Sequence, residues 1–245
     1  MPNLSPRALR LPPQKTTRVH FSALPFGEVP AFLSRLRSRE TISRLALEFL
    51  VLTAARSGEV RGVRWDEIDL AARLWSIPAE RMKAGRAHVV PLSSAALDCL
   101  ARAARYRRED SPLVFPGRQR GQPLSDMALT RLLREMGETV TAHGFRSSFR
   151  DWVAERTHFA PEVAEMALAH AIASQTEAAY RRGNLLKKRR ECMEAWGVYC
   201  TTVPVTAPAS WPAASAVHSP PSDAAGRAEG GGQIPCGPLP QGPFP

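Results

Sequence analysis

Apolar residues recur at helical spacing along most of residues 21–200. The first two such segments are residues 27–36 and 41–55, in which apolar positions three or four residues apart predict helices that face a core. These positions are Val29, Phe32, Leu33 and Leu36 in the first segment and Leu45, Leu47, Phe49 and Leu50 in the second. The pattern predicts further helices over residues 94–107, 125–136, 143–156, 161–168, 174–180 and 185–196. Several of these segments open with Ser or Pro, as the first turn of a helix favours.

Two short runs between the predicted helices are typical of strands. Residues 73–78 and 87–92 are rich in β-prone side chains, and they flank a basic turn, residues 81–86, that contains Gly85. We expect a small antiparallel sheet that carries Lys83 near its tip. The predicted fold class is therefore mainly α with one small antiparallel β-sheet, an α+β arrangement.

Composition divides the chain into three parts. Residues 1–20 are polar, basic and interrupted by proline, which favours a linker or the remnant of an amino-terminal arm. Residues 21–200 carry the periodic pattern and form one predicted domain. Residues 201–245 are dominated by Pro, Ala, Gly and Ser. Such a tail cannot bury enough apolar area to offset its ordering entropy, so we expect it to be disordered.

The charge balance of the chain favours a polyanionic partner. Lys and Arg outnumber Asp and Glu by 33 to 23, and the formal net charge is +10. That excess suits nucleic acid and an affinity that falls with salt. The longest apolar stretch, residues 45–55, is interrupted by Glu48 and is too short to span a bilayer, so neither secretion nor a membrane is expected.

The cysteines do not form a metal-binding pattern. They are scattered and include no Cys-x-x-Cys pair, and no histidine stands at a spacing that would complete a zinc site. We therefore expect reduced, mostly structural thiols in a cytosolic protein, with no metal and no cofactor. The four residues are Cys99, Cys192, Cys200 and Cys236.

Three ordered motifs carry the candidate chemistry. They are Thr-Ala-Ala-Arg-Ser-Gly-Glu-Val at residues 53–60, His-Gly-Phe-Arg at 143–146 and Ala-Leu-Ala-His at 167–170, and Tyr180 follows ten residues after the last motif. In this order they resemble the catalytic domain of tyrosine recombinases of the phage-integrase family. Within that family the wording is most similar to satellite-phage-type integrases of bacterial genomic islands. The resemblance covers residues 21–199 and implies cleavage and rejoining of DNA through a 3′-phosphotyrosine.

The resemblance assigns a role to each matching residue. Arg56 and Arg146 would clamp the scissile phosphate, because a planar guanidinium can present two donors to non-bridging oxygens. Tyr180 would be the nucleophile and Lys83 the general acid for the leaving 5′ oxygen. His143 and His170 would hydrogen-bond the phosphate or relay protons. Glu59, one helical turn after Arg56, would orient that arginine.

Each of these residues also has a simpler interpretation when taken alone. A single Arg or Lys is usually solvated, His143 could cap the helix that it opens, and His170 could end one. Tyr180 could lie at the edge of the core. Their conjunction in one family's order favours the functional interpretation. Elsewhere, Arg181, Arg182 and the basic run 187–190 are typical of a solvated face, Arg118 and Arg120 of a surface loop, and Trp152 and Trp196 of a core.

The chain also departs from the family pattern. Only about twenty residues precede the predicted domain, where such integrases carry core-binding and arm-binding domains that close a clamp around the duplex. We therefore expect a truncated product with weakened DNA affinity. An inactive DNA-binding remnant and a type IB topoisomerase-like relaxase stay open as alternatives. The expected partners are double-stranded DNA, further copies of the chain in a tetramer, and accessory directionality or host bending proteins. The expected location is the bacterial cytoplasm, associated with the nucleoid.

Overall fold

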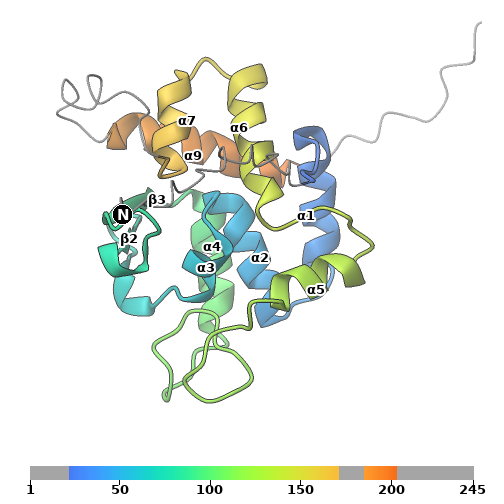
Figure 1. Ribbon diagram of the computed structural model, residues 1–245, viewed down its shortest axis with the longest axis vertical. Helices are drawn as coiled ribbons and strands as arrows, with labels where there is room; N and C mark the ends of the chain where they lie inside the picture. The colour runs from blue at the N-terminus through green and yellow to red at the C-terminus, as the bar shows by residue number, and fades with distance from the viewer. Residues whose placement is uncertain (1–21, 171–184, 203–245) are drawn as a thin grey trace, which may run out of the picture. The chain divides into compact units, whose positions relative to one another are not determined.

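Helices make up most of the ordered elements (Figure 1). The computed structural model describes residues 22–170 and 185–202, all of which belong to one unit of the chain. Its helices are α1 Val29–Arg37, α2 Ile42–Thr53, α3 Ser57–Arg61, α4 Ser94–Ala104, α5 Ala128–Glu135, α6 Gly144–Arg156, α7 Pro161–Ala167 and α9 Leu186–Thr201. Single 3₁₀ turns lie at Phe26–Glu28, Trp65–Glu67 and Ala79–Arg81.

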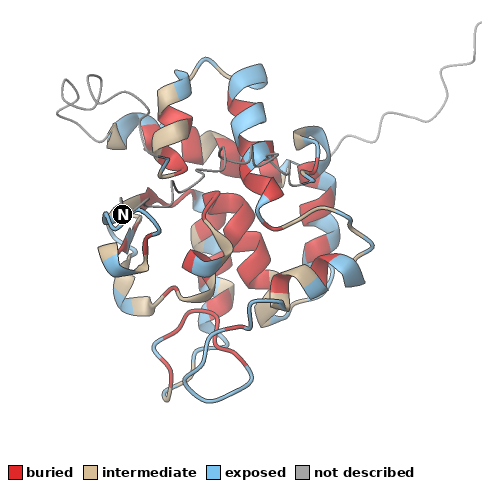
Figure 2. Cartoon of the chain, viewed as in Figure 1, coloured by how far each residue is buried: buried red, intermediate tan, exposed pale blue. Residues whose placement is uncertain are grey.

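Helix α2 is the centre of the core. Every residue from Leu45 to Thr53 is buried, and α1, α4, α5 and α9 all pack against this helix. In Figure 2 the visible part of the same helix is coloured mostly as buried. A helix whose residues are nearly all apolar or buried is stable only inside a protein, so the sequence of α2 requires the surrounding layer of helices.

The sheet has three antiparallel strands in the order β1-β2-β3. Strands β2 (Leu74–Ile77) and β3 (His88–Pro91) pair with Leu74 opposite Pro91 and Ile77 opposite His88. They confirm the predicted hairpin, and Lys83 lies in the turn between them. Strand β1 (Ile68–Asp69) is only two residues long, and the sequence pattern did not predict it.

Helix α6 is anchored from two sides. A Cβ atom on Gly144 would lie 2.4 Å from the carbonyl oxygen of Ser22, so only glycine fits at the first residue of this helix. Farther along, the rings of Phe149 and Trp152 pack on Trp196 of α9 at centroid distances of 5.5 and 5.1 Å. These contacts confirm that Trp152 and Trp196 belong to the core. They also fix the position of the residues that begin α6.

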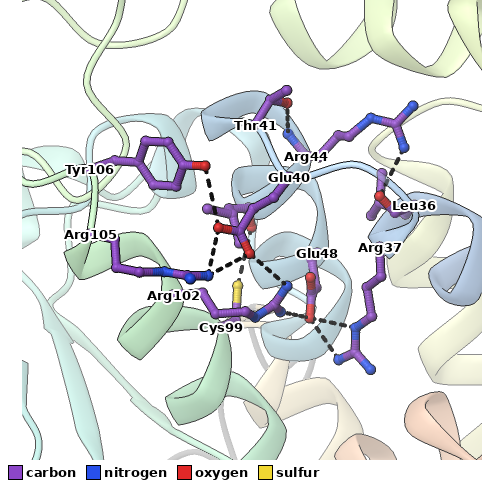
Figure 3. A network of polar contacts seen from close by, with 11 residues as sticks. Leu36, Arg37, Glu40, Thr41, Arg44, Glu48, Cys99, Arg102, Arg105 and Tyr106 are labelled. Carbon is purple, nitrogen blue, oxygen red and sulfur yellow. Dashed lines mark hydrogen bonds and ion pairs between the residues drawn. The ribbon is translucent and has the colours of Figure 1, made fainter.

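An ion-pair cluster ties α1 and α4 to α2 (Figure 3). Glu48 of α2 is 1% exposed, and its Oε1 pairs with Arg37 at 2.6 Å and also with Arg102. Glu40 lies beside this pair and binds Arg105 at 2.7 Å. A buried carboxylate is tolerated only when it is paired, and here two guanidiniums share it.

The predicted helices and strands correspond closely to those observed, with two omissions and one correction. Helix α3 and strand β1 are absent from the prediction, and the predicted helix over residues 174–180 lies outside the described residues. The basic run 187–190 is not a uniformly solvated face. Arg189 is 3% exposed, because its Nη1 donates to the carbonyl oxygen of Val89 at 2.7 Å.

Residues 1–20 and residues 203–245 of the tail predicted over 201–245 lie outside the part of the chain that the structure describes. Thr201, predicted to belong to the tail, is the last residue of α9. Cys99, Cys192 and Cys200 are buried free thiols, as expected, and Cys236 falls outside the described residues. Among the helices of the described residues, none combines the length and apolar content that crossing a membrane requires.

Candidate active site

Arg56 lies in the turn that joins α2 to α3. Helix α2 ends at Thr53, Ala54 adopts the left-handed conformation with φ 50°, and Arg56 is the N-cap of α3. The backbone N–H of Arg56 donates to Glu59 Oε2 at 2.8 Å, and its Nη1 donates to Oε1 at 2.7 Å. Glu59 is only 5% exposed, so one nearly buried carboxylate holds both the main chain and the guanidinium of Arg56.

Arg146 projects from the first turn of α6 and is 4% exposed. Its Nη1 donates to the carbonyl oxygen of Ala54 at 2.6 Å, and its Nη2 donates to that of Leu168 at 2.7 Å. These carbonyls follow the ends of α2 and α7, where helix dipoles concentrate negative charge. Burial and the nearby cation Arg56 lower the pKa of Arg146 to about 10, so the guanidinium stays charged at neutral pH.

His170 meets Arg146 just after α7 ends. Ala169 is left-handed with φ 50°, and this turn brings the His170 ring back over its own helix. Its Nε2 lies 3.1 Å from Arg146 Nη2, and its Nδ1 lies 2.6 Å from Glu165 Oε2. Arg56 Nη2 also reaches this turn and donates to the carbonyl oxygen of Ala169 at 3.4 Å. Arg56, Arg146 and His170 therefore converge on one turn.

His143 and Lys83 lie close enough to this cluster to interact with it electrostatically. His143 is the N-cap of α6, yet its side chain makes no capping hydrogen bond, so simple helix capping does not explain it. The pKa of His143 is lowered, mainly because its ring is partly withdrawn from water and next because Arg146 and Arg56 are nearby cations. His170 and Lys83 lower the same pKa further. Tyr180 lies outside the described residues.

The sequence patterns did not single out two histidine contacts. Glu165 binds His170 from a position five residues earlier, and His88 of β3 approaches the end of α7, with Nε2 3.3 Å from the carbonyl oxygen of Ala167. Burial and the adjacent Arg189 lower the pKa of His88 to about 4, so this ring is neutral at pH 7. Neither of these two contacts has a recognisable signal in the sequence.

The arrangement is suited to a compact anion. The buried guanidinium of Arg146 and the partly exposed one of Arg56 concentrate positive charge, and a lowered local dielectric strengthens their attraction for a negatively charged group. The Nε of Arg146 is buried and has no hydrogen-bond partner among the described residues. Within the described ranges, no group of three or more His, Cys, Asp or Glu side chains is placed to hold a metal ion.

Comparisons with known proteins find integrases among the relatives of this chain. Prophage integrase IntZ of Escherichia coli K12 is 36% identical over 179 residues, which cover 71% of this chain and 44% of IntZ. The integrase of Enterobacteria phage P4 is 33% identical over 200 residues, which cover 74% of this chain and 45% of that integrase. The chain thus spans less than half the length of these two relatives.

A solved structure supports the fold. The crystal structure of XerA recombinase superposes with a TM-score of 0.52 at 15% identity, and the match covers 74% of this chain and 66% of XerA. The model of the phage integrase family matches residues 23–185. This segment contains the six residues to which the sequence analysis gave a catalytic role, namely Arg56, Lys83, His143, Arg146, His170 and Tyr180. This chain therefore belongs to the phage integrase family.

Proposed function

We propose that the chain is the catalytic domain, residues 21–200, of a site-specific DNA recombinase, which cleaves and rejoins strands through a 3′-phosphotyrosine. The convergence of Arg56, Arg146 and His170 on one turn is the observation that carries this proposal. These residues come from three separate parts of the chain, and their order is that of the family. A site that gathers the buried guanidinium of Arg146 and the partly exposed one of Arg56 can balance the charge of a pentavalent phosphate.

In the proposed reaction, the hydroxyl oxygen of Tyr180 attacks the scissile phosphorus and the bond to the 5′ oxygen breaks. The phenol proton passes to a neighbouring histidine, and Lys83 gives a proton to the departing 5′ oxygen. One P–O bond forms and one breaks, so the phosphotyrosine stores the energy for the reverse attack by a 5′ hydroxyl. Arg56 and Arg146 hold the non-bridging oxygens throughout, and Glu59 keeps Arg56 in place.

The proposed partners follow from the same chemistry. The net charge of +10 supports double-stranded DNA as the substrate, and exchange of strands between two duplexes requires several copies of the chain, which favours a tetramer on DNA. Accessory directionality or bending proteins would act on the DNA around such a complex. The proposed place of action is the bacterial cytoplasm, at the nucleoid.

A nicked duplex that bears the core site of the host element tests the proposal. Cleavage next to the nick releases a short fragment, which prevents religation and traps the covalent adduct. We expect an SDS-resistant protein–DNA band with the wild-type chain and none with Tyr180→Phe, which removes only the nucleophilic oxygen. Persistence of the band in Tyr180→Phe would exclude Tyr180 as the nucleophile. Failure of the folded wild-type chain to form any band would contradict an active catalytic domain.

A further inference from the structure

Glu165 connects the proposed site to the outer surface of α6 and α7. Its Oε2 lies 2.6 Å from Nδ1 of His170, and its Oε1 lies 2.7 Å from Nε of Arg150 on α6. The side chain of Glu165 is 32% exposed, and that of His170 is 38% exposed. One carboxylate thus joins an arginine of α6 to the histidine that follows α7, and the motifs give Glu165 no role.

The partners of His170 determine where its ring proton lies. A guanidinium only donates hydrogen bonds, so His170 Nε2, at 3.1 Å from Arg146 Nη2, must accept. A carboxylate only accepts, so Nδ1, at 2.6 Å from Glu165, must donate. Both requirements are met by one state, the neutral imidazole with its proton on Nδ1. An Nε2–H tautomer or an imidazolium would set two donors against each other at Arg146.

We propose that Glu165 is a positioning residue that fixes His170 as the Nδ1–H tautomer and directs the Nε2 lone pair toward the phosphate-binding arginines. Nε2 then carries no proton in the resting site, and it can take one up during strand cleavage once Arg146 Nη2 donates to the phosphate instead of to His170. The carboxylate on the other side balances the positive charge that this uptake creates, as a buried acid does for a catalytic histidine. This catalytic consequence rests on the proposed function, whereas the tautomer does not.

Heteronuclear NMR of the ¹⁵N-labelled chain at neutral pH tests the tautomer without any activity. His170→Gln identifies the His170 ring signals. We expect a protonated Nδ1 and an unprotonated Nε2 in the wild type, and a weaker preference for this tautomer in Glu165→Ala, in which only Arg146 still selects it. A proton on Nε2 of the wild type, or an equally strong preference in Glu165→Ala and the wild type, would overturn the proposal.

Single-turnover cleavage of the nicked duplex tests the consequence. We expect Glu165→Ala to slow cleavage on the order of tenfold to a hundredfold, the range typical when a group that orients a metal-bound histidine is removed, with DNA affinity unchanged. Glu165→Gln should restore part of the rate, because the amide oxygen can still accept from Nδ1, although the neutral amide cannot balance the charge of the imidazolium. Both variants lose the ion pair with Arg150, so the difference between them isolates the tautomer.

Glu155→Ala is the matched control, since it removes an exposed carboxylate from α6 and should cleave like the wild type. Equal rates in Glu165→Ala and the wild type would overturn the positioning role, as would equal losses in Glu165→Ala and Glu165→Gln. If the wild type forms no adduct, the proposed function fails, and the NMR measurement alone decides whether Glu165 sets the tautomer.

Discussion

Glu59 binds Arg56 twice, through the backbone N–H at 2.8 Å and through Nη1 at 2.7 Å. The two bonds differ in purpose, because the first caps α3 and the second orients a guanidinium. Glu59 is nearly buried, so its negative charge is balanced by Arg56 and not by water. The Arg56 side chain is 25% exposed, so its positive charge is still partly hydrated. The pair of Arg56 and Glu59 therefore fixes both the first turn of α3 and the orientation of the Arg56 guanidinium.

Replacement of Glu59 by alanine should weaken both the fold and the site. It leaves the Arg56 N–H without its acceptor and frees the guanidinium, so we expect the free energy of unfolding to fall by about 1–3 kcal/mol. Urea denaturation at neutral pH measures this change. Glu80→Ala, at an exposed carboxylate in the Ala79–Arg81 turn, should stay within about 0.5 kcal/mol of the wild type. Equal stability of the two variants would contradict the capping role.

Replacement of Glu48 by alanine tests how much a buried, paired carboxylate contributes to stability. Its carboxylate is 1% exposed and pairs with Arg37 and Arg102, whose side chains are 32% and 27% exposed (Figure 3). Removal of one member of a buried pair typically costs about 3–5 kcal/mol, and we expect Glu48→Ala to fall at the lower end because both arginines can reach water.

The neighbouring Glu40 provides the control for Glu48. Its side chain is 28% exposed and binds Arg105, which is 63% exposed, so Glu40→Ala should cost no more than about 1 kcal/mol. Urea midpoints of the two variants at equal protein concentration give the comparison. A loss in Glu40→Ala as large as that in Glu48→Ala would show that burial does not set the strength of this cluster.

His88 should make stability depend on pH. Its pKa falls from 6.5 in the unfolded chain to about 4 in the folded state, mainly because the ring is buried. Between these two values the unfolded state binds more protons, so stability rises with pH. The contribution is fully present above pH 6.5 and is lost as pH falls toward 4. It amounts to at most about 3 kcal/mol.

The pH effect is measured as the difference between the wild type and His88→Gln, in which the amide can still donate to the Ala167 carbonyl. Urea unfolding at pH 7, 6 and 5 should show a steeper loss of stability in the wild type than in the variant. Parallel curves for the two proteins would mean that folding does not lower the pKa of His88.

The sequence predicts the helices that are long and strongly periodic. Helix α2 is an example, because its apolar positions can be recognised without tertiary information. Helix α3 and strand β1 are too short to carry a period, and they form because Arg56 is capped by Glu59 and because Ile68 pairs with Trp75 of β2. The sequence suggests that Arg189 is solvated, yet it is buried and donates to the carbonyl oxygen of Val89 on β3.

In the candidate site too, the sequence identifies residues but not their contacts. Arg56, Arg146, His143 and His170 can be named from motifs, but their contacts depend on backbone geometry that no motif encodes. His170 meets Glu165 only because Ala169 takes a left-handed turn, which alanine rarely adopts. Arg146 is held by carbonyl oxygens of Ala54 and Leu168, and carbonyls at helix ends are invisible in a sequence.

The left-handed turn at Ala169 should respond to glycine. A non-glycine residue at φ 50° is strained, so Ala169→Gly should raise the free energy of unfolding by about 0.5–1 kcal/mol. Ala101→Gly, in the exposed interior of α4, should lower it by about 1 kcal/mol. Opposite signs for the same substitution, measured by urea denaturation, would establish the strain. A loss of stability at both positions would contradict it.

The proposed role of Lys83 as the general acid predicts that the cleavage rate depends on the leaving group. Lys83 is exposed in the β2–β3 turn, and Lys83→Ala should slow cleavage of an ordinary nicked duplex by roughly 10²- to 10⁴-fold. A substrate with sulfur in place of the bridging 5′ oxygen should be cleaved at nearly the wild-type rate, because a thiol has a pKa of about 8.5 and leaves without a proton donor. Arg86→Ala, in the same turn, should affect both substrates equally. If the sulfur substrate does not rescue Lys83→Ala, then Lys83 acts on DNA binding and the proton must come from another residue.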